Sequence, residues 1–317
     1  MNYVGIDISK ESFDVVVRKE EKYNHHKFSN DRSGFKQFLK LLDKEVHWCV
    51  MEASGPYYQK LAGYLQANDI KLSVVNPLVI RRFCQMRLVK AKTDKKDAMM
   101  IAEYGKTEKP KAWRADERYL LELKQMQAYL EQLNKSRTGF IRQLEAFKQS
   151  PVMTKEVKNG IAKMIKTCEK QILEVEQKME EIIRNNHQEM FDQVKSIPGV
   201  GKKTSLMLVV ISGGFTKFQN AKQLSSYVGL SPRIFESGSS VKGKVRICKM
   251  GMSRVRAMLY VCAWSAIKCN KACKELYDRL VDKGKAKQLA LIAVANKLLK
   301  QAFALATKGE FYKTEII

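Results

Sequence analysis

The chain has 317 residues and carries 58 Lys and Arg side chains against 33 Asp and Glu, a formal net charge of +25. This length allows two or three domains with a substantial core, and the charge excess makes nucleic acid the first partner to consider. A membrane surface is the less favoured partner, because no apolar run approaches the roughly 20 residues of a spanning helix.

Targeting signals and cysteine spacing narrow the class of protein further. The N-terminus reads as a strand and not as a signal sequence, which predicts a cytoplasmic protein. The seven Cys residues have irregular spacings, which argues against a disulfide framework. Cys262, Cys269 and Cys273 lie in an apolar helical segment without a paired Cys-x-x-Cys partner, so we expect packing residues there and not zinc ligands.

The residues up to about 110 predict an α/β domain. Hairpin strands come first and alternating strands and helices follow, which favours one mixed sheet with helices on its faces. The expected elements are a β-meander over 2–28, a helix from Asp31, a strand at 48–52, a helix opened by Ser54-Gly55-Pro56, and a strand at 72–75 that stops at Asn76-Pro77.

Four carboxylates stand at the ends of these elements. Asp7 interrupts the first apolar strand and Glu52 closes another, and a charge among apolar neighbours is costly unless a cation pairs with it. Asp94 and Asp97 begin a helix, and their spacing places both on one face. Hard Mg²⁺ prefers carboxylate oxygens, and two such ions roughly 4 Å apart can clamp a phosphodiester. A metal site at a sheet end is therefore our hypothesis, and a solvated strand end is the alternative.

A dense basic run surrounds two of these carboxylates. Charge runs are usually solvated faces, but this position favours contact with phosphate groups. The run comprises Arg81, Arg82, Arg87, Lys90, Lys92, Lys95 and Lys96.

From Tyr119 to about Asn185 the apolar residues follow heptad spacing, in two runs that Ser150-Pro151 separates. This pattern predicts an antiparallel helical hairpin or a dimerising coiled coil. Arg137 falls at a core position, where it would fix register or partner choice at some cost in stability. We expect a spacer or an assembly device without catalytic chemistry.

The last third of the chain is predicted to be mostly helical. Its glycine-rich turn at Ser196–Thr204 lacks the spacing of a Walker loop. The turn fits a helix-hairpin-helix motif, whose backbone N–H groups bind a DNA phosphate. A plain connection between helices is the alternative. The polar stretch from Ser231 to Lys244 has the composition of a basic linker. The expected fold class is α/β plus all-α, with domains at 1–113, 114–190 and 191–317.

Short motifs occur in a fixed order along the chain: Gly5-Ile6-Asp7, Glu52-Ala53-Ser54-Gly55, Asn76-Pro77, Lys92-Thr93-Asp94-Lys95-Lys96-Asp97-Ala98, Ile197-Pro198-Gly199-Val200-Gly201, Gly229-Leu230-Ser231-Pro232-Arg233, Glu236-Ser237-Gly238-Ser239-Ser240 and Lys297-Leu298-Leu299. Each motif is weak alone, whereas their order and spacing are highly specific. Nearly end to end, the chain resembles the bacterial insertion-sequence transposases that pair an N-terminal DEDD, RuvC-like domain with a C-terminal serine domain. These are the RNA-guided bridge recombinases.

The resemblance implies an RNase H-like first domain and a C-terminal domain that carries the catalytic serine. It implies that Asp7, Glu52, Asp94 and Asp97 bind divalent metal, Mg²⁺ or Mn²⁺, and that Ser237 joins covalently to DNA. The implied partners are double-stranded donor and target DNA, a structured guide RNA, and further copies of the chain, from dimer to tetramer. No membrane is implied, and a cytoplasmic protein would lie at the nucleoid when bound to DNA.

Chemistry alone does not choose among Ser237, Ser239 and Ser240, because Gly238 would let the backbone approach a phosphate beside either neighbour. The motif match selects Ser237. Serine is a weak nucleophile at neutral pH, and no His lies near Ser237 in the sequence, which favours activation by metal over a His-dependent triad.

Three other interpretations remain open at this point. The main one is a metal-dependent nuclease of the Holliday-junction type, which would use the same carboxylates and water in place of Ser237. A non-enzymatic nucleic-acid-binding protein would show no Mg²⁺-dependent cleavage. Actin-like sugar kinases and chaperone ATPases also begin with Gly-x-Asp, but they need further glycine-rich phosphate loops, which this sequence lacks.

Overall fold

The computed structural model describes residues 2–19, 22–89, 93–233, 236–237, 241–242 and 246–313. The chain divides into two compact units, Met1–Ala115 and Asp116–Ile317, each with its own hydrophobic core. The hairpin that the sequence predicts at 114–190 shares its core with the C-terminal helices. This packing does not test the expected division into three domains, which stays a prediction.

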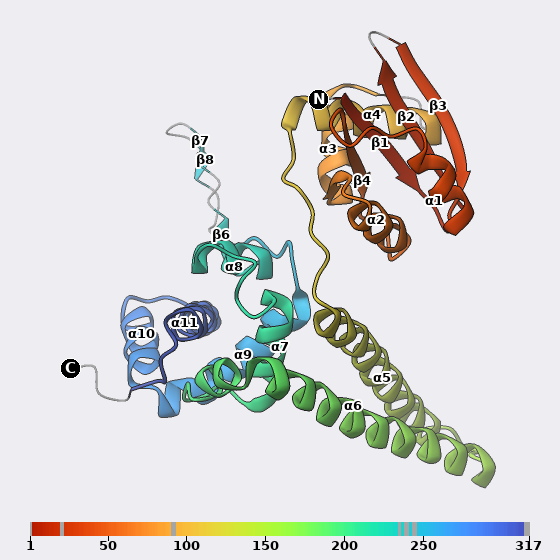
Figure 1. Ribbon diagram of the computed structural model, residues 1–317. Coiled ribbons are helices and arrows are strands. Elements are labelled where there is room, and N and C mark those ends of the chain that lie inside the picture. The colour runs from red at the N-terminus through yellow and green to blue at the C-terminus, as the bar shows by residue number, and fades with distance from the viewer. Residues whose placement is uncertain are drawn as a thin grey trace. The chain divides into compact units, whose positions relative to one another are not determined.

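The first unit is built on a five-stranded mixed sheet with the strand order β3-β2-β1-β4-β5. The first three strands form an antiparallel meander, and the last two run parallel to β1 (Figure 1), which confirms the predicted mixed sheet. The strands are β1 (Asn2–Ile8), β2 (Ser12–Lys19), β3 (Lys22–Ser29), β4 (His47–Glu52) and β5 (Lys71–Val75).

Helices cover both faces of this sheet because both faces carry apolar side chains. On one face, Ile6 and Phe13 pack with residues of α1 (Arg32–Leu39) and α2 (Tyr58–Ala67). On the other face, Val50 and Val75 pack with residues of α3 (Pro77–Met86) and α4 (Asp94–Glu108). The sheet is therefore the middle layer of three.

Helix α3 is a feature that the sequence analysis missed. Asn76-Pro77 does end strand β5, as predicted, but it also begins a helix at once. The Asn76 side chain accepts a hydrogen bond from the Leu78 N–H at 2.9 Å, and Pro77 occupies the first helical position, where its missing N–H costs nothing. The basic run thus begins within a helix, at Arg81 and Arg82.

The two heptad runs form a helical hairpin, α5 (Arg118–Lys148) and α6 (Lys155–Lys195), as predicted. Figure 1 shows α5 lying along α6. Leu130 and Ile172 are buried within this single chain, so the apolar seam is satisfied without a partner there. Burial on α5 stops at Leu133, and Arg137 is half-buried with its Nε lacking a hydrogen-bond partner among the described residues. A dimerising coiled coil stays a prediction.

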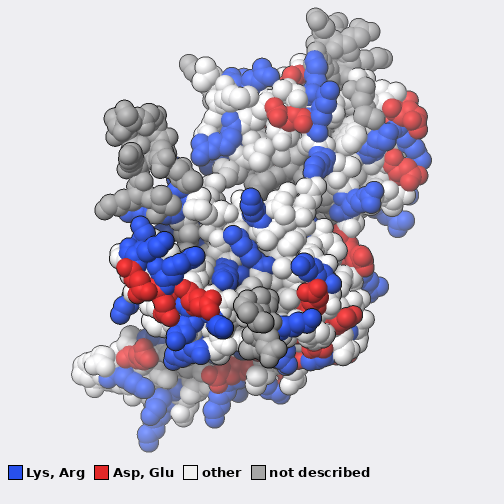
Figure 2. Space-filling view, turned by 90° about the vertical axis from the view of Figure 1, so that its left-hand side faces the viewer, with Lys and Arg blue, Asp and Glu red and all other residues white. Residues whose placement is uncertain are grey.

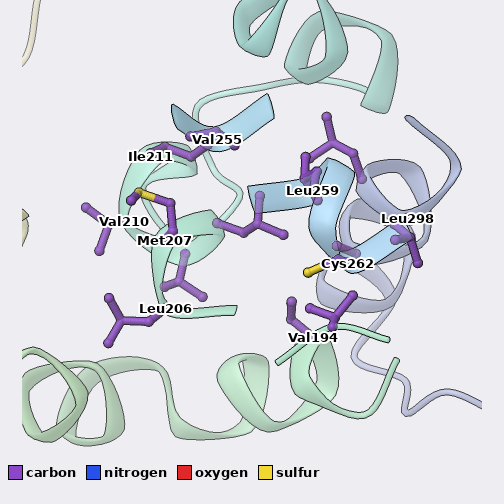
Figure 3. Packing of buried hydrophobic residues seen from close by; sticks show 14 of the residues in the cluster. Val194, Leu206, Met207, Val210, Ile211, Val255, Leu259, Cys262 and Leu298 are labelled. Atoms are coloured by element: carbon purple, nitrogen blue, oxygen red, sulfur yellow. The ribbon is translucent and has the colours of Figure 1, made fainter. Parts of the chain in front are cut away.

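Five further helices pack around the end of the hairpin in one core. Figure 3 shows Val194 of α6, Met207 of α7, Leu259 of α9 and Leu298 of α11 packing together there. Cys262 and Cys273 are buried, as predicted for packing residues, whereas Cys269 is exposed. The helices are α7 (Lys202–Ser212), α8 (Ala221–Val228), α9 (Ser253–Cys269), α10 (Lys271–Asp282) and α11 (Lys287–Lys308).

Helix α11 corrects the expectation that no apolar run approaches membrane-spanning length. It has 22 residues, and by length and composition it could cross a bilayer. Its apolar side chains, such as Leu291, Val294 and Leu298, are buried in the core of the second unit. Packing inside the protein therefore accounts for its apolar composition.

The polar stretch after Ser231 is only partly a linker, because it contains paired strands. Strand β6 (Pro232–Arg233) pairs with β9 (Arg246–Ile247), and β7 (Glu236–Ser237) pairs with β8 (Val241–Lys242). Ser237 thus belongs to a short β-ribbon. The other serines of the motif, Ser239 and Ser240, and the basic residues Lys90, Lys92 and Lys244 lie outside the described residues.

Candidate active site

One cavity of the first unit is lined by all four predicted carboxylates, and its volume is about 780 Å³. Asp7 comes from β1, Glu52 from the end of β4, and Asp94 and Asp97 from the first turn of α4. The rest of the lining comes mainly from α3. The structure therefore brings together four residues that are up to 90 positions apart in the sequence.

The local fold explains why these carboxylates meet. Strands β1 and β4 are parallel, and Ile6 stands opposite Met51, so the next residues, Asp7 and Glu52, reach the same edge of the sheet. Thr93 caps α4 by accepting a hydrogen bond from the Lys96 N–H at 3.2 Å. The positive end of a helix dipole favours acidic side chains, which suits Asp94 and Asp97 at this terminus.

Gly5 sets how closely α4 approaches β1. A Cβ atom at this position would lie 2.0 Å from the Ala98 carbonyl oxygen and 2.4 Å from the Ala102 nitrogen, both of them backbone atoms. Backbone cannot move aside as a flexible side chain can. The glycine therefore fixes the position of the helix that carries Asp94 and Asp97.

We expect Gly5→Ala to destabilise the first unit and to inactivate the protein. The added methyl group would push α4 away from the sheet, and overpacking of this kind typically costs about 1–3 kcal/mol. Urea unfolding measures the loss. Gly63→Ala in α2 is the matched control, because its Cβ would meet no atom within 4 Å; stability equal to wild type in Gly5→Ala would contradict this packing.

Negative charge accumulates in the cavity. Burial raises the pKa of Asp7 to about 6, and the charges of Asp97, Asp94 and Glu52 add to the shift. Burial also raises the pKa of the Cys84 thiol, again with help from Asp97 and Glu52. Several negative charges gathered in one cavity favour a cationic ligand.

The chemistry of the donor set fits Mg²⁺ or Mn²⁺, since every candidate ligand is a carboxylate oxygen. The carboxylate groups nevertheless stand apart. In the described part of the chain, no three Asp, Glu, His or Cys side chains lie close enough together to hold a metal ion. The side chains that line the cavity would therefore have to move toward an ion to bind it.

Some residues that line the cavity were not predicted from the sequence to lie there. Ser54 donates a hydrogen bond from Oγ to the Glu52 carboxylate, which restrains that side chain. Arg81 and Gln85 line the cavity from α3. The sequence signal for them was available: Asn76-Pro77 is a typical helix start, and positions four apart on the resulting helix share a face.

Asp14 is a fifth carboxylate near Asp7, and it is buried and paired. It stands opposite Asp7 in the β1–β2 register and adds to the rise in the pKa of Asp7. His25 Nε2 lies 2.7 Å from Asp14 Oδ1, and Lys27 Nζ lies 3.7 Å from Oδ2. Asp14 is therefore paired with side chains of the neighbouring strand, and it is not one of the predicted metal ligands.

Ser237 belongs to the second unit, and all four carboxylates belong to the first.

The glycine-rich turn between α6 and α7 is in the second unit as well. Gly199 has a φ of +95° and lies against Ala266 of α9, so that glycine is required for packing. Lys203 Nζ lies 2.7 Å from Glu176, and Lys202 pairs with Glu180. Binding of DNA phosphate at this turn stays a prediction.

Comparisons with known proteins cover almost the whole chain. A family described as Transposase matches residues 4–149, and one described as Transposase IS116/IS110/IS902 family matches residues 192–278. The pilin gene-inverting protein of Moraxella lacunata is 31% identical over 99% of this chain and 98% of its own length. The chain belongs to the IS110 family of transposases.

Another relative of this IS110-family transposase is the transposase for insertion sequence element IS1111A of Coxiella burnetii. It is 25% identical over 98% of this chain and 91% of its own length. The protein is thus an enzyme that rearranges DNA, and DNA is its substrate. The net charge of +25 suits that substrate, and Figure 2 shows basic side chains spread across the face that it presents, with smaller groups of acidic ones between them.

Proposed function

We propose that this IS110-family transposase is an RNA-guided recombinase with a Mg²⁺-dependent site at Asp7, Glu52, Asp94 and Asp97, and with Ser237 as its nucleophile. The observation that carries the proposal is the single cavity lined by all four carboxylates. Residues drawn from two strands and a helix meet there, although burial and mutual repulsion raise the pKa of Asp7. An arrangement that is electrostatically costly without a cation indicates a functional site.

The proposed fold of the first unit is RNase H-like. The support is a five-stranded sheet in which an antiparallel meander continues into two parallel strands, with helices on both faces. In this arrangement the first strand is central and delivers Asp7 beside the end of β4.

In the proposed site Asp7, Glu52, Asp94 and Asp97 would hold Mg²⁺ or Mn²⁺. When bound, such ions supply positive charge that stabilises a phosphodiester under attack. The residues of the chain provide the position: Ser54 restrains Glu52, and the Thr93 cap and Gly5 fix the start of α4.

Ser237 carries the covalent step of the proposal. Its Oγ forms a bond to the phosphorus of the DNA strand, and the bond from that phosphorus to the leaving sugar oxygen breaks. The serine proton passes to water, and the leaving oxygen takes up a proton. A sugar hydroxyl of the second strand then attacks the same phosphorus, releases the serine and joins the strands. Each step exchanges one phosphoester bond for another.

A metal-dependent nuclease that uses water is the second candidate. The observation that favours it is the assignment of the four carboxylates to one unit and of Ser237 to the other. The two candidates leave different products. Protein-linked DNA after denaturation supports the serine, and free phosphate ends with no protein attached support water.

A structured guide RNA is the proposed second nucleic acid partner. The proposed location is the cytoplasm, with the protein at the nucleoid when it is bound to DNA. The basic surface and the family membership support a nucleic acid partner of either kind. Sequencing the RNA that copurifies with the protein tests the guide. One enriched transcript from the flank of the element supports guidance, and a random sample of cellular RNA contradicts it.

We further propose that the hairpin joins copies of the chain into a dimer that builds toward a tetramer. Leu130 and Ile172 are buried within the hairpin, but Leu173 is 59% exposed and is available to a second copy. We expect Leu173→Glu to shift sedimentation to smaller species without lowering the melting temperature. Ile172→Glu is the contrasting variant, because it should unfold the hairpin. A wild type that stays monomeric at high concentration with nucleic acid bound would contradict the proposal.

A further inference from the structure

One face of α3 lines the acidic cavity and carries hydrogen-bond donors. Leu78, Arg81 and Gln85 are spaced three and four apart, which places them on the same side of the helix, and all three line the cavity. Among the described residues of that lining, Arg81 is the one cation. The cavity thus combines four carboxylates with a single guanidinium.

The neighbouring basic side chains contact other described residues, whereas Arg81 forms no ion pair or hydrogen bond with any described residue. Arg82 Nη1 donates a hydrogen bond to Gln85 Oε1 at 3.1 Å, and Arg87 lies over the Phe83 ring at 5.4 Å from its centroid. No carboxylate oxygen of the described residues lies within 4.0 Å of the Arg81 guanidinium. An arginine that shares a cavity with four carboxylates and still pairs with none of them is available for an anionic ligand.

We propose that Arg81 binds the two non-bridging oxygens of the DNA phosphodiester that reacts in this cavity. The inference rests on the proposed function, because it takes the carboxylate cavity as the place of reaction. A guanidinium is planar and presents paired N–H donors that match two oxygens of one phosphate. The hydrogen bond from Arg82 occupies the amide oxygen of Gln85, which leaves the Gln85 NH₂ group as a second donor on the same face.

Charge and space both support this assignment. A phosphodiester that enters a cavity with four carboxylates is repelled unless cations compensate, and Arg81 adds a fixed positive charge that metal binding does not supply. The cavity volume of about 780 Å³ lies within the roughly 300–1,000 Å³ of typical ligand sites. Its walls therefore leave room for a phosphodiester between Arg81 and the carboxylates.

The experiment compares recombination by variants of the full-length protein, with its copurifying RNA, on a plasmid that carries the ends of the element. We expect Arg81→Ala to lower the recombination frequency about 100-fold, the effect of removing one preorganised donor from a charged transition state. Arg81→Lys should recombine about tenfold more often than Arg81→Ala, because it restores the positive charge but not the bidentate geometry. Arg32→Ala is the matched control, because it removes the same charge from an exposed position of α1, outside the cavity and outside the basic run; we expect a change within about threefold.

A second measurement separates this inference from the proposed function. The rise in melting temperature with Mg²⁺, measured without DNA, should persist in Arg81→Ala and disappear in Asp94→Asn. Full recombination by Arg81→Ala together with an inactive Asp94→Asn would overturn the role of Arg81 and leave the carboxylate site standing. Equal losses in Arg81→Ala and Arg32→Ala would also overturn it, and so would loss of the Mg²⁺ response in Arg81→Ala. Full activity in Asp94→Asn would instead refute the proposed function.

Discussion

Asp94→Asn should lower recombination on the order of 10³-fold or more while the protein stays folded. Stabilisation of transition-state charge by a bound metal is worth several kcal/mol, and each 1.36 kcal/mol is a factor of about ten in rate. The substitution keeps the shape of the side chain and removes a negative charge from a crowded cavity, so the first unit should not lose stability. We expect the same loss of activity from Asp7→Asn, Glu52→Gln and Asp97→Asn.

The direct readout is binding of metal, followed by the melting temperature. A ligand that binds only the folded state stabilises it, so saturating Mg²⁺ should raise the melting temperature of wild type on the order of 5 °C. Each of the four variants should lose most of this rise. Asp69→Asn is the matched control, because Asp69 is an exposed carboxylate of the same unit, its one ion pair among the described residues is with Lys44, and it lies outside the cavity. Undiminished recombination in EDTA would show that metal is not required.

Ser237→Ala should abolish strand exchange and leave DNA binding intact. Removal of an enzyme's nucleophile costs on the order of 10⁴-fold or more in rate, because no other group can form the covalent intermediate. Few contacts with DNA are lost, since only one oxygen atom is removed. Recombination should fall to background, while the affinity for DNA changes by less than about twofold.

Mapping of the adduct identifies the serine. A nicked DNA substrate traps the intermediate, and digestion followed by mass spectrometry of the DNA-linked peptide locates the phosphoester. Ser239→Ala and Ser240→Ala are the controls and should keep substantial activity, because they belong to the same motif. An adduct on another residue, or full activity in Ser237→Ala, would mean that the assignment to Ser237 is wrong.

The elements that the sequence predicted well are those with a strong local signal. Alternation of apolar residues located β1 to β3, and heptads located α5 and α6. Asp94 and Asp97 were placed correctly at a helix start, where the Thr93 cap is now visible. Local periodicity and capping chemistry depend on neighbours in the chain, which is why they can be read without a structure.

The features that the sequence did not predict depend on short elements or on contacts between distant residues. Helix α3 buries few side chains, mainly Ile80 and Phe83, so its apolar pattern was too weak to outweigh the strand stop at Asn76-Pro77. The β-ribbon that carries Ser237 is made of strands of two residues, which are too short to show alternation. The close approach at Gly5 and the hydrogen bond from Ser54 to Glu52 appear only in three dimensions.

The separate hydrophobic cores of the two units have a consequence for the life of the mobile element. Met1–Ala115 carries every proposed metal ligand, and Asp116–Ile317 carries the proposed nucleophile, so neither half of the gene encodes a complete reaction centre. A copy of the element that is truncated between the halves would yield a fragment that has its own hydrophobic core but lacks the residues for complete strand exchange. Such fragments would occupy nucleic acid or intact copies of the protein without reacting. Decay of old copies in a genome would then restrain the active ones, and the element would limit its own spread.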